Sequence, residues 1–522
     1  MAQDILVDRL QSPELFDHLV TKFEVIETHI SWVLLTGEYA YKIKKPVNFG
    51  FLDFSTLEKR HLYCREELRL NRRLAPQLYL DVVSIHGSVA HPEFNSHAPV
   101  IEYAVKMQQF PQSTQLDRIL EENGLDNLIM DKLADKVAHF HLLIDLAKDE
   151  SDFGDLDHVR QPVLENFKHI RTSIDDIRIS QQLNKLEQWS KQQLLELKGA
   201  INQRKIQGFV RECHGDMHLR NIALWNDEII IFDCIEFNKN FYWIDVISDM
   251  AFLVMDLEDR HQDILAQHFL NQYLEITGDY EGLSLLRFYK VYRALVRAKV
   301  GALRIGQEQP DSQEYAQTYK GFIQYLELAE RYIKPAIPCL LINHGISGSG
   351  KTFFSRRIMQ KYPAIHVRSD VERKRLFRIA EGSDSTAAIG EDLYRPEATQ
   401  KTYARLLEIA KSLLMAGYSV LIDATNLKMQ QRLPFIELAQ SLRMSCFILD
   451  FHASIETLSR RVKQRSLEGK DMSDATLDIM QHQFTNYEPL SHDEQPFIID
   501  IDTDSDINID DIVERIRAGH LT

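Results

Sequence analysis

The sequence predicts two domains of different fold class: a two-lobed α+β domain over residues 1–335 and an α/β domain with a parallel sheet over residues 336–522. Three observations support this. The first part runs from strands through one helix back to strands and then into a long helical stretch, which is a two-lobe plan. The second part alternates short apolar strands with helices, which favours a parallel sheet. Between them, Pro335 and Pro338 follow a helical stretch at about 312–333 and interrupt it.

Length and composition indicate a folded multidomain chain. The 522 residues are 44% apolar, which is ample for globular cores. The N-terminal segment lacks the basic start and apolar core of a signal peptide, and no apolar run approaches membrane-spanning length. The five cysteines are scattered and contain no C-x-x-C pair. We therefore expect a cytoplasmic protein with no membrane partner and no zinc site.

The charge distribution bears on the ligand. A net charge of -16 argues against a bulk nucleic-acid coat, because Lys and Arg grip phosphate backbones. The stretch 336–490 is nevertheless locally basic, with 21 basic and 17 acidic residues. That balance suits a small anionic ligand at least as well as a polymer.

The first domain reads as a small lobe at about 20–110 and a helical large lobe at about 111–335. Alternating apolar residues and turn residues such as Gly37 indicate strands, and a 3.6-residue period indicates helices. In chain order the expected elements are strands within 20–45, a helix within 55–75, strands within 79–110 and helices within 126–208.

Residues 214–221 read HGDMHLRN, and Asp233 follows directly behind the apolar strand IIIF. Phosphoryl transfer needs one carboxylate to orient the acceptor hydroxyl, and an amide and a second carboxylate to hold metal on the nucleotide phosphates. Asp216, Asn221 and Asp233 are residues of these types. Their spacing predicts that they surround one cleft.

The pattern H-G-D-x-H-x-x-N, followed by a strand ending in Asp, resembles the aminoglycoside phosphotransferase-like branch of the protein-kinase fold. The resemblance implies that Asp216 is the catalytic base and that Asn221 and Asp233 are metal ligands. It also implies that His214 braces the loop and that Asp249 steadies it.

The same resemblance places the nucleotide lysine on the third strand, where Lys42 is the best match and Lys44, on the same strand face, is the alternative. Its acidic partner on the following helix is expected to be Glu67, which fits the spacing to Leu74 better than Glu66 does. The glycine-rich loop of the family is absent, and THIS stands in its place, so that Ser31 would contact phosphate through its backbone and hydroxyl.

Other polar residues of this domain receive ordinary interpretations. We expect His139 and His141 to serve packing rather than metal binding, because they lie in a helical stretch. Glu236 is expected to be an exposed turn acid, with a contact to a second metal as the alternative.

Residues 345–352 read GISGSGKT, a complete phosphate-binding loop between an apolar strand and a helix. Its glycines permit the close backbone approach that lets N–H groups surround phosphate oxygens. Lys351 would reach the terminal phosphates, and Thr352 would offer its hydroxyl to Mg²⁺. The residues expected to bind nucleotide are Gly345, Ser347, Gly348, Ser349, Gly350, Lys351 and Thr352.

Asp423 ends another buried strand, as does the acid that holds Mg²⁺ in P-loop proteins. Five short apolar strands separated by helices are expected, within the stretches 338–343, 366–377, 419–427, 446–453 and 496–503, with the nucleotide at their carboxyl ends. A switch-type ATPase would need a further acid beside Asp423, but residue 424 is Ala, which disfavours hydrolysis of that kind.

The finer pattern of this half resembles the polynucleotide kinase and zeta-toxin group of P-loop kinases. That resemblance implies that Asp370 activates the acceptor hydroxyl, with Arg373 nearby, and that Asn426 and Arg432 lie on the acceptor side. Another pair, Arg461 and Arg465, is spaced i,i+4 on one helix face and matches the lid arginines of the group.

Three hypotheses follow for the whole chain. In the first, both domains use ATP and Mg²⁺ to phosphorylate hydroxyl groups of a small metabolite, a nucleotide or an RNA end. In the second, the N-terminal domain is a kinase-like binding or regulatory module and only the P-loop domain is active, as the missing glycine-rich loop suggests. In the third, the chain is an ATP-binding switch without a phosphorylated substrate, which the combination of Asp370, Arg461 and Arg465 disfavours.

Overall fold

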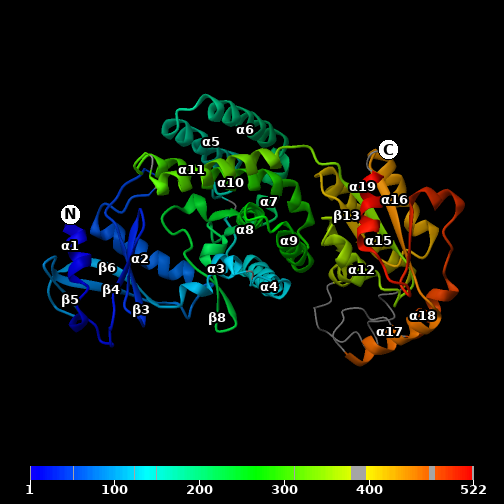
Figure 1. Ribbon diagram of the computed structural model, residues 1–522, viewed down its shortest axis with the longest axis horizontal. Coiled ribbons are helices and arrows are strands. Elements are labelled where there is room, and N and C mark those ends of the chain that lie inside the picture. The colour runs from blue at the N-terminus through cyan, green and yellow to red at the C-terminus, as the bar shows by residue number, and fades with distance from the viewer. Residues whose placement is uncertain are drawn as a thin grey trace. The chain divides into compact units, whose positions relative to one another are not determined.

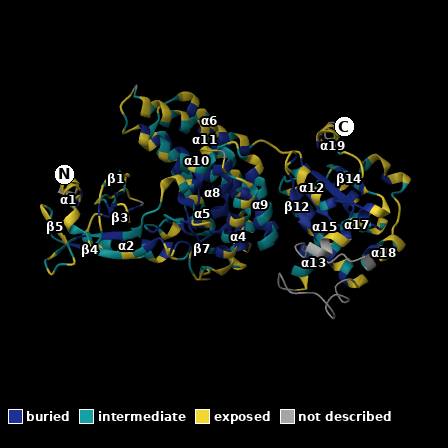
Figure 2. Ribbon diagram, turned by 60° about the horizontal axis from the view of Figure 1, so that its bottom comes forward, coloured by how far each residue is buried: buried dark blue, intermediate teal, exposed yellow. Residues whose placement is uncertain are grey.

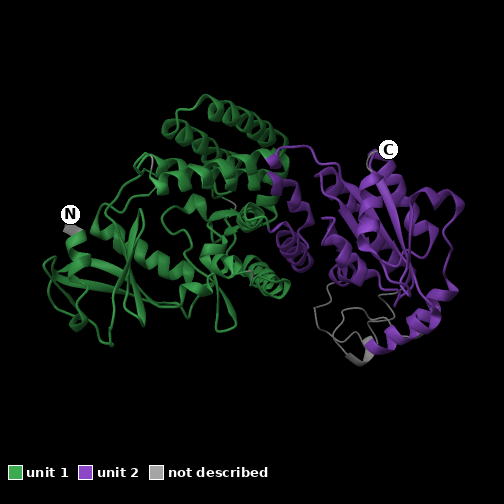
Figure 3. Ribbon diagram, viewed as in Figure 1, with its two compact units in different colours: residues 1–261, 288–330 green, residues 262–287, 331–522 purple. Residues whose placement is uncertain are grey.

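The computed structural model describes residues 2–50, 52–122, 124–148, 150–310, 312–377, 395–468 and 477–519. The chain packs into two compact units (Figure 3): unit 1 consists of Met1–His261 and Phe288–Glu330, and unit 2 of Gln262–Arg287 and Arg331–Thr522. The chain therefore enters unit 2 after His261, returns to unit 1 at Phe288 and leaves it again after Glu330. The compact units describe how the chain packs. The domain boundary expected near residue 336 stays a prediction.

The small lobe of unit 1 is an antiparallel sheet of strand order β1-β2-β3-β6-β4-β5. Helix α2 packs on β6 and β4 (Figure 1), and the Thr56 side chain caps its first turn by accepting from Lys59 N. Leu34, Tyr41 and Ala104 belong to the core of the sheet. The predicted strands and helix are confirmed, and β5 was not anticipated. The bounds are α1 (Ala2–Arg9), β1 (Glu24–Glu27), β2 (Ser31–Leu35), β3 (Tyr39–Lys44), α2 (Leu57–Asn71), β4 (Tyr79–Ser88), β5 (His91–Phe94) and β6 (Val100–Gln108).

The large lobe of unit 1 is mainly helical, as predicted, and α8 runs through its core. All residues of α8 from Val246 to Leu257 are buried (Figure 2). Two short antiparallel pairs, β7 with β10 and β8 with β9, flank the segment 214–221. The bounds are α3 (Leu116–Glu121), α4 (Asn127–Leu143), α5 (Leu156–Ser173), α6 (Ile177–Glu196), α7 (Lys198–Ile206), β7 (Val210–Glu212), β8 (Ile222–Trp225), β9 (Glu228–Ile231), β10 (Trp243–Asp245), α8 (Val246–Asp259), α10 (Leu283–Ile305) and α11 (Gln313–Tyr332). The start of α10, up to Arg287, and the end of α11, from Arg331, belong to unit 2.

Unit 2 contains a five-stranded sheet of order β12-β13-β11-β14-β15, in which every neighbouring pair is parallel. Every residue of β11, β12 and β13 is buried, because helices cover both faces of the sheet (Figure 1). The five predicted strands are confirmed. The bounds are α9 (Asp263–Thr277), β11 (Cys339–His344), α12 (Lys351–Met359), β12 (Ile365–Arg368), α13 (Ser369–Leu376), α15 (Pro396–Met415), β13 (Val420–Asp423), α16 (Met429–Ser441), β14 (Ser445–His452), α17 (Ile455–Glu468), α18 (Leu477–Thr485), β15 (Ile498–Asp502) and α19 (Ile509–Ala518).

Two chain-wide properties complete the description. All five cysteines are buried free thiols. Across the described ranges, none of the helices has both the length and the apolar character that a membrane crossing requires.

Candidate active sites

In unit 1, a buried carboxylate holds the segment 214–221 in place. Asp249 of α8 accepts hydrogen bonds from His214 N at 2.9 Å and from Gly215 N at 2.8 Å, and its Oδ2 lies 3.2 Å from His141 Nε2. Gly215 has φ +86°, and a Cβ there would lie 2.6 Å from the Phe241 carbonyl oxygen, so glycine is required. These contacts agree with the steadying role expected for Asp249.

His141, Cys213 and Asp249 bring one ligand atom each within 4.8 Å of one another. Each is already engaged: the Cys213 thiol donates to Ile244 O, and burial raises the pKa of that thiol well above its ordinary value. In this structure these side chains hydrogen-bond within the protein beneath the loop, and the packing role expected for His141 stays a prediction.

Asp216 and Asn221 meet in the same loop. Asn221 Nδ2 donates to Asp216 Oδ2 at 3.1 Å and to Asp216 O at 3.0 Å, while His218 Nε2 lies 3.3 Å from the carboxylate. The Asp216 side chain keeps 32% exposure. Burial raises the pKa of Asp216, but attraction to His218 more than offsets this, and the net pKa lies below its ordinary value. Asp216 is therefore an ionised, accessible carboxylate, which is the state a proton acceptor needs.

Asp233 lies behind β9 in a left-handed conformation, with φ +61°. Its backbone N–H donates to the Tyr79 hydroxyl at 3.1 Å, and the preceding Phe232 N donates to Asn221 O at 2.9 Å. These bonds tie the Asp233 turn to the Asn221 segment. The left-handed angle is unfavourable for a non-glycine residue, so the surrounding bonds must hold it.

Lys42 of β3 reaches both expected partners. Its Nζ lies 2.5 Å from Asp233 Oδ1 and 2.8 Å from Glu67 Oε1. Burial lowers the pKa of Lys42, but Asp233 and Glu67 raise it well above its ordinary value overall. Burial likewise raises the pKa of Glu67, yet the two lysines bring it down to about 2. Lys42 is thus a cation held beside the candidate metal ligand.

Lys44, on the same strand, is more deeply buried than Lys42 and has a different set of ion-pair partners. It is almost completely buried, pairs with Glu67 at 2.6 Å and with Glu236, and stands 4.8 Å from the Phe54 ring centroid. The expectation for Glu236 is wrong, because this carboxylate is 5% exposed and ion-paired rather than an exposed turn acid. Since Lys42 keeps more exposure and contacts Asp233, the geometry favours Lys42 over Lys44 on the nucleotide side.

Ser31 does not occupy an open position. Its hydroxyl is buried, its N–H donates to Thr28 Oγ1 at 3.0 Å, and its carbonyl accepts from Thr28 N at 2.9 Å. A tight turn therefore uses the backbone N–H that was expected to meet phosphate, and the hydroxyl is buried, so the expectation for Ser31 is corrected.

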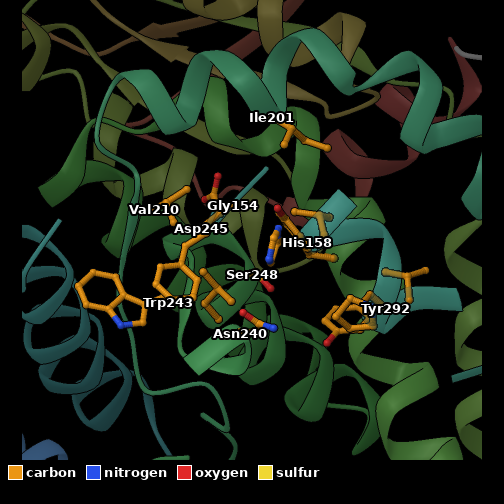
Figure 4. A pocket seen from close by; sticks show the side chains of 15 residues that line it. Gly154, His158, Ile201, Val210, Asn240, Trp243, Asp245, Ser248 and Tyr292 are labelled. Atoms are coloured by element: carbon orange, nitrogen blue, oxygen red, sulfur yellow. The ribbon is translucent and has the colours of Figure 1, made fainter. Parts of the chain in front are cut away.

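A cavity of about 40 Å³ lies elsewhere in the large lobe (Figure 4). Trp243, Tyr292 and Ser248 line it together with Asp245, which already pairs with Arg204 at 2.6 Å. A space of this size holds water molecules rather than a metabolite.

In unit 2 the phosphate-binding loop joins β11 to α12. Gly345, Gly348 and Gly350 have φ values of +138°, +88° and +88°. A Cβ on Gly345 would lie 2.3 Å from Phe451 O, so the close backbone approach requires glycine there. Lys351 Nζ donates to Gly345 O at 2.9 Å and to Ile346 O at 3.0 Å, which folds the cation over its own loop.

The expected metal-side pair is in direct contact. Thr352 Oγ1 donates to Asp423 Oδ2 at 2.9 Å, and Asn343 Nδ2 donates to Asp423 Oδ1 at 2.9 Å. His366 Nε2 lies 3.1 Å from Asp423 Oδ2. Burial raises the pKa of Asp423, but the hydrogen bond with His366 and its charge outweigh this, and the pKa lies below its ordinary value. A hydroxyl beside an ionised carboxylate is a donor set that suits Mg²⁺.

Asp370 lies in the first turn of α13, and its carboxylate keeps 29% exposure. Arg368 Nη2 donates to its Oδ2 at 2.8 Å, and Val371 N donates to its Oδ1 at 3.0 Å. Arg373 follows one turn later on the same helix. Neither His366 nor Arg368 was singled out from the sequence, although their i,i+2 spacing on β12 placed both on one strand face.

Arg461 of α17 lies over the phosphate-binding loop. Its Nη1 donates to Gly348 O at 3.3 Å and to Thr503 Oγ1 at 2.9 Å. The side chain of Arg465, its expected companion, lies outside the described residues. A residue of α18 also reaches the loop: Ser347 N donates to Gln483 Oε1 at 2.8 Å, a contact that nothing in the sequence indicated.

Two acceptor-side expectations are corrected. Arg432 is completely buried, and its guanidinium pairs with Glu494 through bonds of 2.5 and 3.1 Å. Asn426 is also completely buried, and its side-chain Nδ2 donates to Asn343 O at 2.6 Å, while its backbone carbonyl accepts from Arg432 Nη1 at 2.9 Å. Both side chains are buried inside unit 2, so neither presents a polar group to an acceptor in this structure.

These folds and sites define unit 1 as a two-lobed kinase-like domain and unit 2 as a P-loop domain. Residues 340–490 match the model of the AAA_33 family, described as an AAA domain, which confirms the P-loop part of the resemblance. The chain is 28% identical over 456 residues to uncharacterized proteins of Mycobacterium tuberculosis and Mycobacterium bovis, covering 87% of this chain and 88% of each relative. An alignment of that length includes parts of both units.

Among solved structures, the chain is similar to an amicoumacin kinase in complex with AMP-PNP, Ca²⁺ and Ami, at 13% identity and a TM-score of 0.40, covering 63% of this chain and 93% of that one. It is also similar to the APS kinase CysC of Mycobacterium tuberculosis in complex with AMPPNP and APS, at 16% identity and a TM-score of 0.26, covering 36% of this chain and all of that one. The ligands are those of the named proteins.

Proposed function

We propose that this protein is an ATP-dependent phosphotransferase with one nucleotide site in each unit, and that each site transfers the γ-phosphoryl group to a hydroxyl acceptor. The contact between Thr352 and Asp423, directly behind a complete phosphate-binding loop, is the observation that carries the proposal. A hydroxyl and a carboxylate in this position would hold the metal ion that binds the nucleotide phosphates. The accessible carboxylate of Asp370 would accept the proton of an acceptor hydroxyl, which favours transfer to a hydroxyl over the ATP switch.

The proposed cofactors are ATP and Mg²⁺. In unit 2 Thr352 and Asp423 would hold the metal, and in unit 1 Asn221 and Asp233 would hold it. Bound Mg²⁺ would neutralise charge on the phosphates during transfer. The protein's own part is to orient the acceptor at Asp216 or Asp370 and to place cations such as Lys42 and Lys351 beside the nucleotide.

The acceptors that we propose are small metabolites, nucleotides or RNA ends rather than long nucleic acids. The net charge of -16 supports this choice, because a polymer would need an extended basic surface. We include a cytoplasmic location in the proposal, supported by the five buried free thiols.

A phosphotransfer screen tests the activity. The full chain is incubated with [γ-³²P]ATP, Mg²⁺ and an extract of cell metabolites and small RNA, and labelled products are compared between the parent, Asp216→Asn and Asp370→Asn. Each substitution should remove its own set of labelled products. Release of free phosphate alone, unchanged in Asp370→Asn, would contradict the kinase function of unit 2 and favour the ATP switch.

A second candidate function concerns unit 1, namely that it binds or regulates without catalysis. It is favoured by the buried Ser31 hydroxyl, which makes no phosphate contact in place of the missing glycine-rich loop. Isothermal titration distinguishes the two: two ATP sites should be seen in the parent and one in Lys351→Ala. If Lys351→Ala removed all binding, unit 1 would not be a nucleotide site.

A further inference from the structure

Helix α9 belongs to unit 2, although more than 60 residues of chain separate its end from the phosphate-binding loop. It lies along β12, the edge strand of the parallel sheet. Asn271 Oδ1 accepts from His366 N at 3.0 Å, and Asn271 Nδ2 donates to Ala364 O at 3.1 Å. Gln267 Nε2 donates to the same carbonyl at 3.0 Å. Side-chain amides thus take the place of a further strand and cover the exposed edge.

One turn after Asn271, Glu275 reaches the site itself. Arg368 Nη1 donates to Glu275 Oε1 at 2.9 Å, while Nη2 of the same guanidinium donates to Asp370 Oδ2 at 2.8 Å. The Glu275 side chain is 14% exposed and that of Arg368 is 7% exposed, so this bridge is largely shielded from water. Arg375 Nη2 also donates to Glu275 O at 2.5 Å, which fixes the backbone beneath it.

The bridge determines how Arg368 holds Asp370. A guanidinium presents two parallel N–H groups that match both oxygens of one carboxylate, and such bidentate pairs are the stronger arrangement. Because Glu275 engages Nη1, Asp370 receives a single bond from Arg368, and 29% of its side chain stays exposed. Without Glu275, Arg368 is free to turn both N–H groups toward Asp370 and to occupy the oxygens that an acceptor must reach.

We propose that α9 completes the acceptor side of the P-loop site, with Glu275 as a positioning residue that acts through Arg368 on Asp370. The inference rests on the proposed role of Asp370 in unit 2. In that step the acceptor O–H gives its proton to Asp370, the acceptor oxygen bonds to the γ-phosphorus, and the bond from that phosphorus to the β,γ-bridging oxygen breaks. ADP leaves, and the proton passes from Asp370 to solvent.

The experiment uses the full chain with Asp216→Asn, so that labelled products report unit 2. Glu275→Gln, which keeps the shape but replaces the charged partner of Arg368 Nη1 by a neutral and weaker acceptor, is compared with Glu281→Gln. Glu281 is a matched control on the same segment, since it is 62% exposed and contacts Arg405 at 3.4 Å on the surface. Label transfer from [γ-³²P]ATP to the extract, the Kd for ATP and the Tm are measured for each.

We expect Glu275→Gln to lower the rate of label transfer roughly 10- to 100-fold, as misplacement of a reacting group does, while the Kd for ATP changes less than about twofold. Glu281→Gln should match the parent. In a chain that also carries Arg368→Gln, Glu275→Gln should have no further effect, because the two residues act in series.

The outcomes separate the two claims. No label transfer by the Asp216→Asn parent would overturn the proposed function of unit 2 and the role of Glu275 with it. Transfer that is equal in Glu275→Gln and Glu281→Gln would overturn the positioning role alone. The positioning role would also be overturned if Glu275→Gln lowered the transfer rate by the same factor with and without Arg368→Gln. It would be overturned as well if the lower rate of Glu275→Gln equalled its loss of folded protein, and if Glu275→Asp restored neither.

Discussion

Thr352 Oγ1 donates a 2.9 Å hydrogen bond to Asp423 Oδ2, which joins the first turn of α12 to the carboxyl end of β13. The two residues are 71 positions apart in the chain, and the parallel sheet brings them together. Asn343 and His366 hold the same carboxylate from neighbouring strands. The hydroxyl and carboxylate therefore stand pre-oriented before any ligand arrives.

The hydroxyl of Thr352 should set the Mg²⁺ requirement of unit 2. Thr352→Val removes the hydroxyl and keeps the shape, whereas Thr352→Ser keeps the hydroxyl. We expect Thr352→Val to raise the Mg²⁺ concentration for half-maximal transfer roughly 10-fold or more, and Thr352→Ser to stay near the parent. Label transfer across a Mg²⁺ series, in chains that carry Asp216→Asn, measures this. Equal Mg²⁺ requirements for the two variants would contradict a metal role for Thr352.

Lys44 and Lys42 of β3 should differ in how much each contributes to the stability of unit 1. Lys44→Met leaves Glu236 buried without its cation, and breaking a buried ion pair in this way costs about 3–5 kcal/mol of unfolding free energy. Lys42→Met leaves Glu67 paired with Lys44 and Asp233 partly exposed, so its stability cost should be smaller.

For nucleotide binding, Lys42→Met should have the larger effect and Lys44→Met the smaller one. In chains that carry Lys351→Ala, Lys42→Met should abolish the remaining ATP heat in isothermal titration, while folded Lys44→Met retains it. Lys45→Met is the control, because Lys45 pairs with the exposed Glu27. Loss of ATP binding in Lys44→Met but not in Lys42→Met would reverse the assignment of the two lysines.

Asp249 should make unit 1 sensitive to acid. Burial raises the pKa of Asp249, but the hydrogen bond with His141 opposes this effect, and the net result is a pKa lowered from 3.8 to about 2. A carboxyl whose pKa is lower in the folded state than in the unfolded state stabilises the protein at pH values above its unfolded-state pKa. This stabilisation is lost as the pH falls through the folded-state pKa. Its contribution should therefore be complete above about pH 4 and disappear toward pH 2, amounting to roughly 2 kcal/mol.

Tryptophan fluorescence can follow this change in unit 1 alone, since Trp32, Trp189, Trp225 and Trp243 all lie there. In urea unfolding at a series of pH values, Asp249→Asn should lower stability at neutral pH and flatten the fall between about pH 4 and pH 2. A parallel fall in the variant and the parent would show that another group causes the acid sensitivity.

Gln483 should compete with nucleotide for the phosphate-binding loop. Its Oε1 accepts from Ser347 N, one of the N–H groups that the loop motif offers to phosphate. We expect Gln483→Ala to tighten ATP binding at unit 2 several-fold, which corresponds to the net free energy of about one hydrogen bond. Gln481→Ala on the exposed side of α18 is the control. Weaker binding in Gln483→Ala would show instead that Gln483 holds the bound nucleotide.

Local sequence patterns predicted most of the fold. The strands of both sheets, apart from β5, and the helix at 57–71 follow from apolar patterns and helical periodicity, which are local properties. The pairing of Thr352 with Asp423 was also predictable, because a strand-end acid and a phosphate-binding loop have fixed places in a parallel sheet. Glu236 was misjudged, since its burial depends on Lys44, almost 200 residues earlier.

The sequence by itself determined the two fold classes and the chemical types gathered at each site, because spacing within a strand, a turn or a loop fixes them. Only the tertiary structure decided which of these side chains are accessible. Arg432 and Asn426 are turned into the protein, and Asp370 is bridged through Arg368 to Glu275. Burial and ion pairing across distant segments depend on how the elements pack, and no local pattern records that packing.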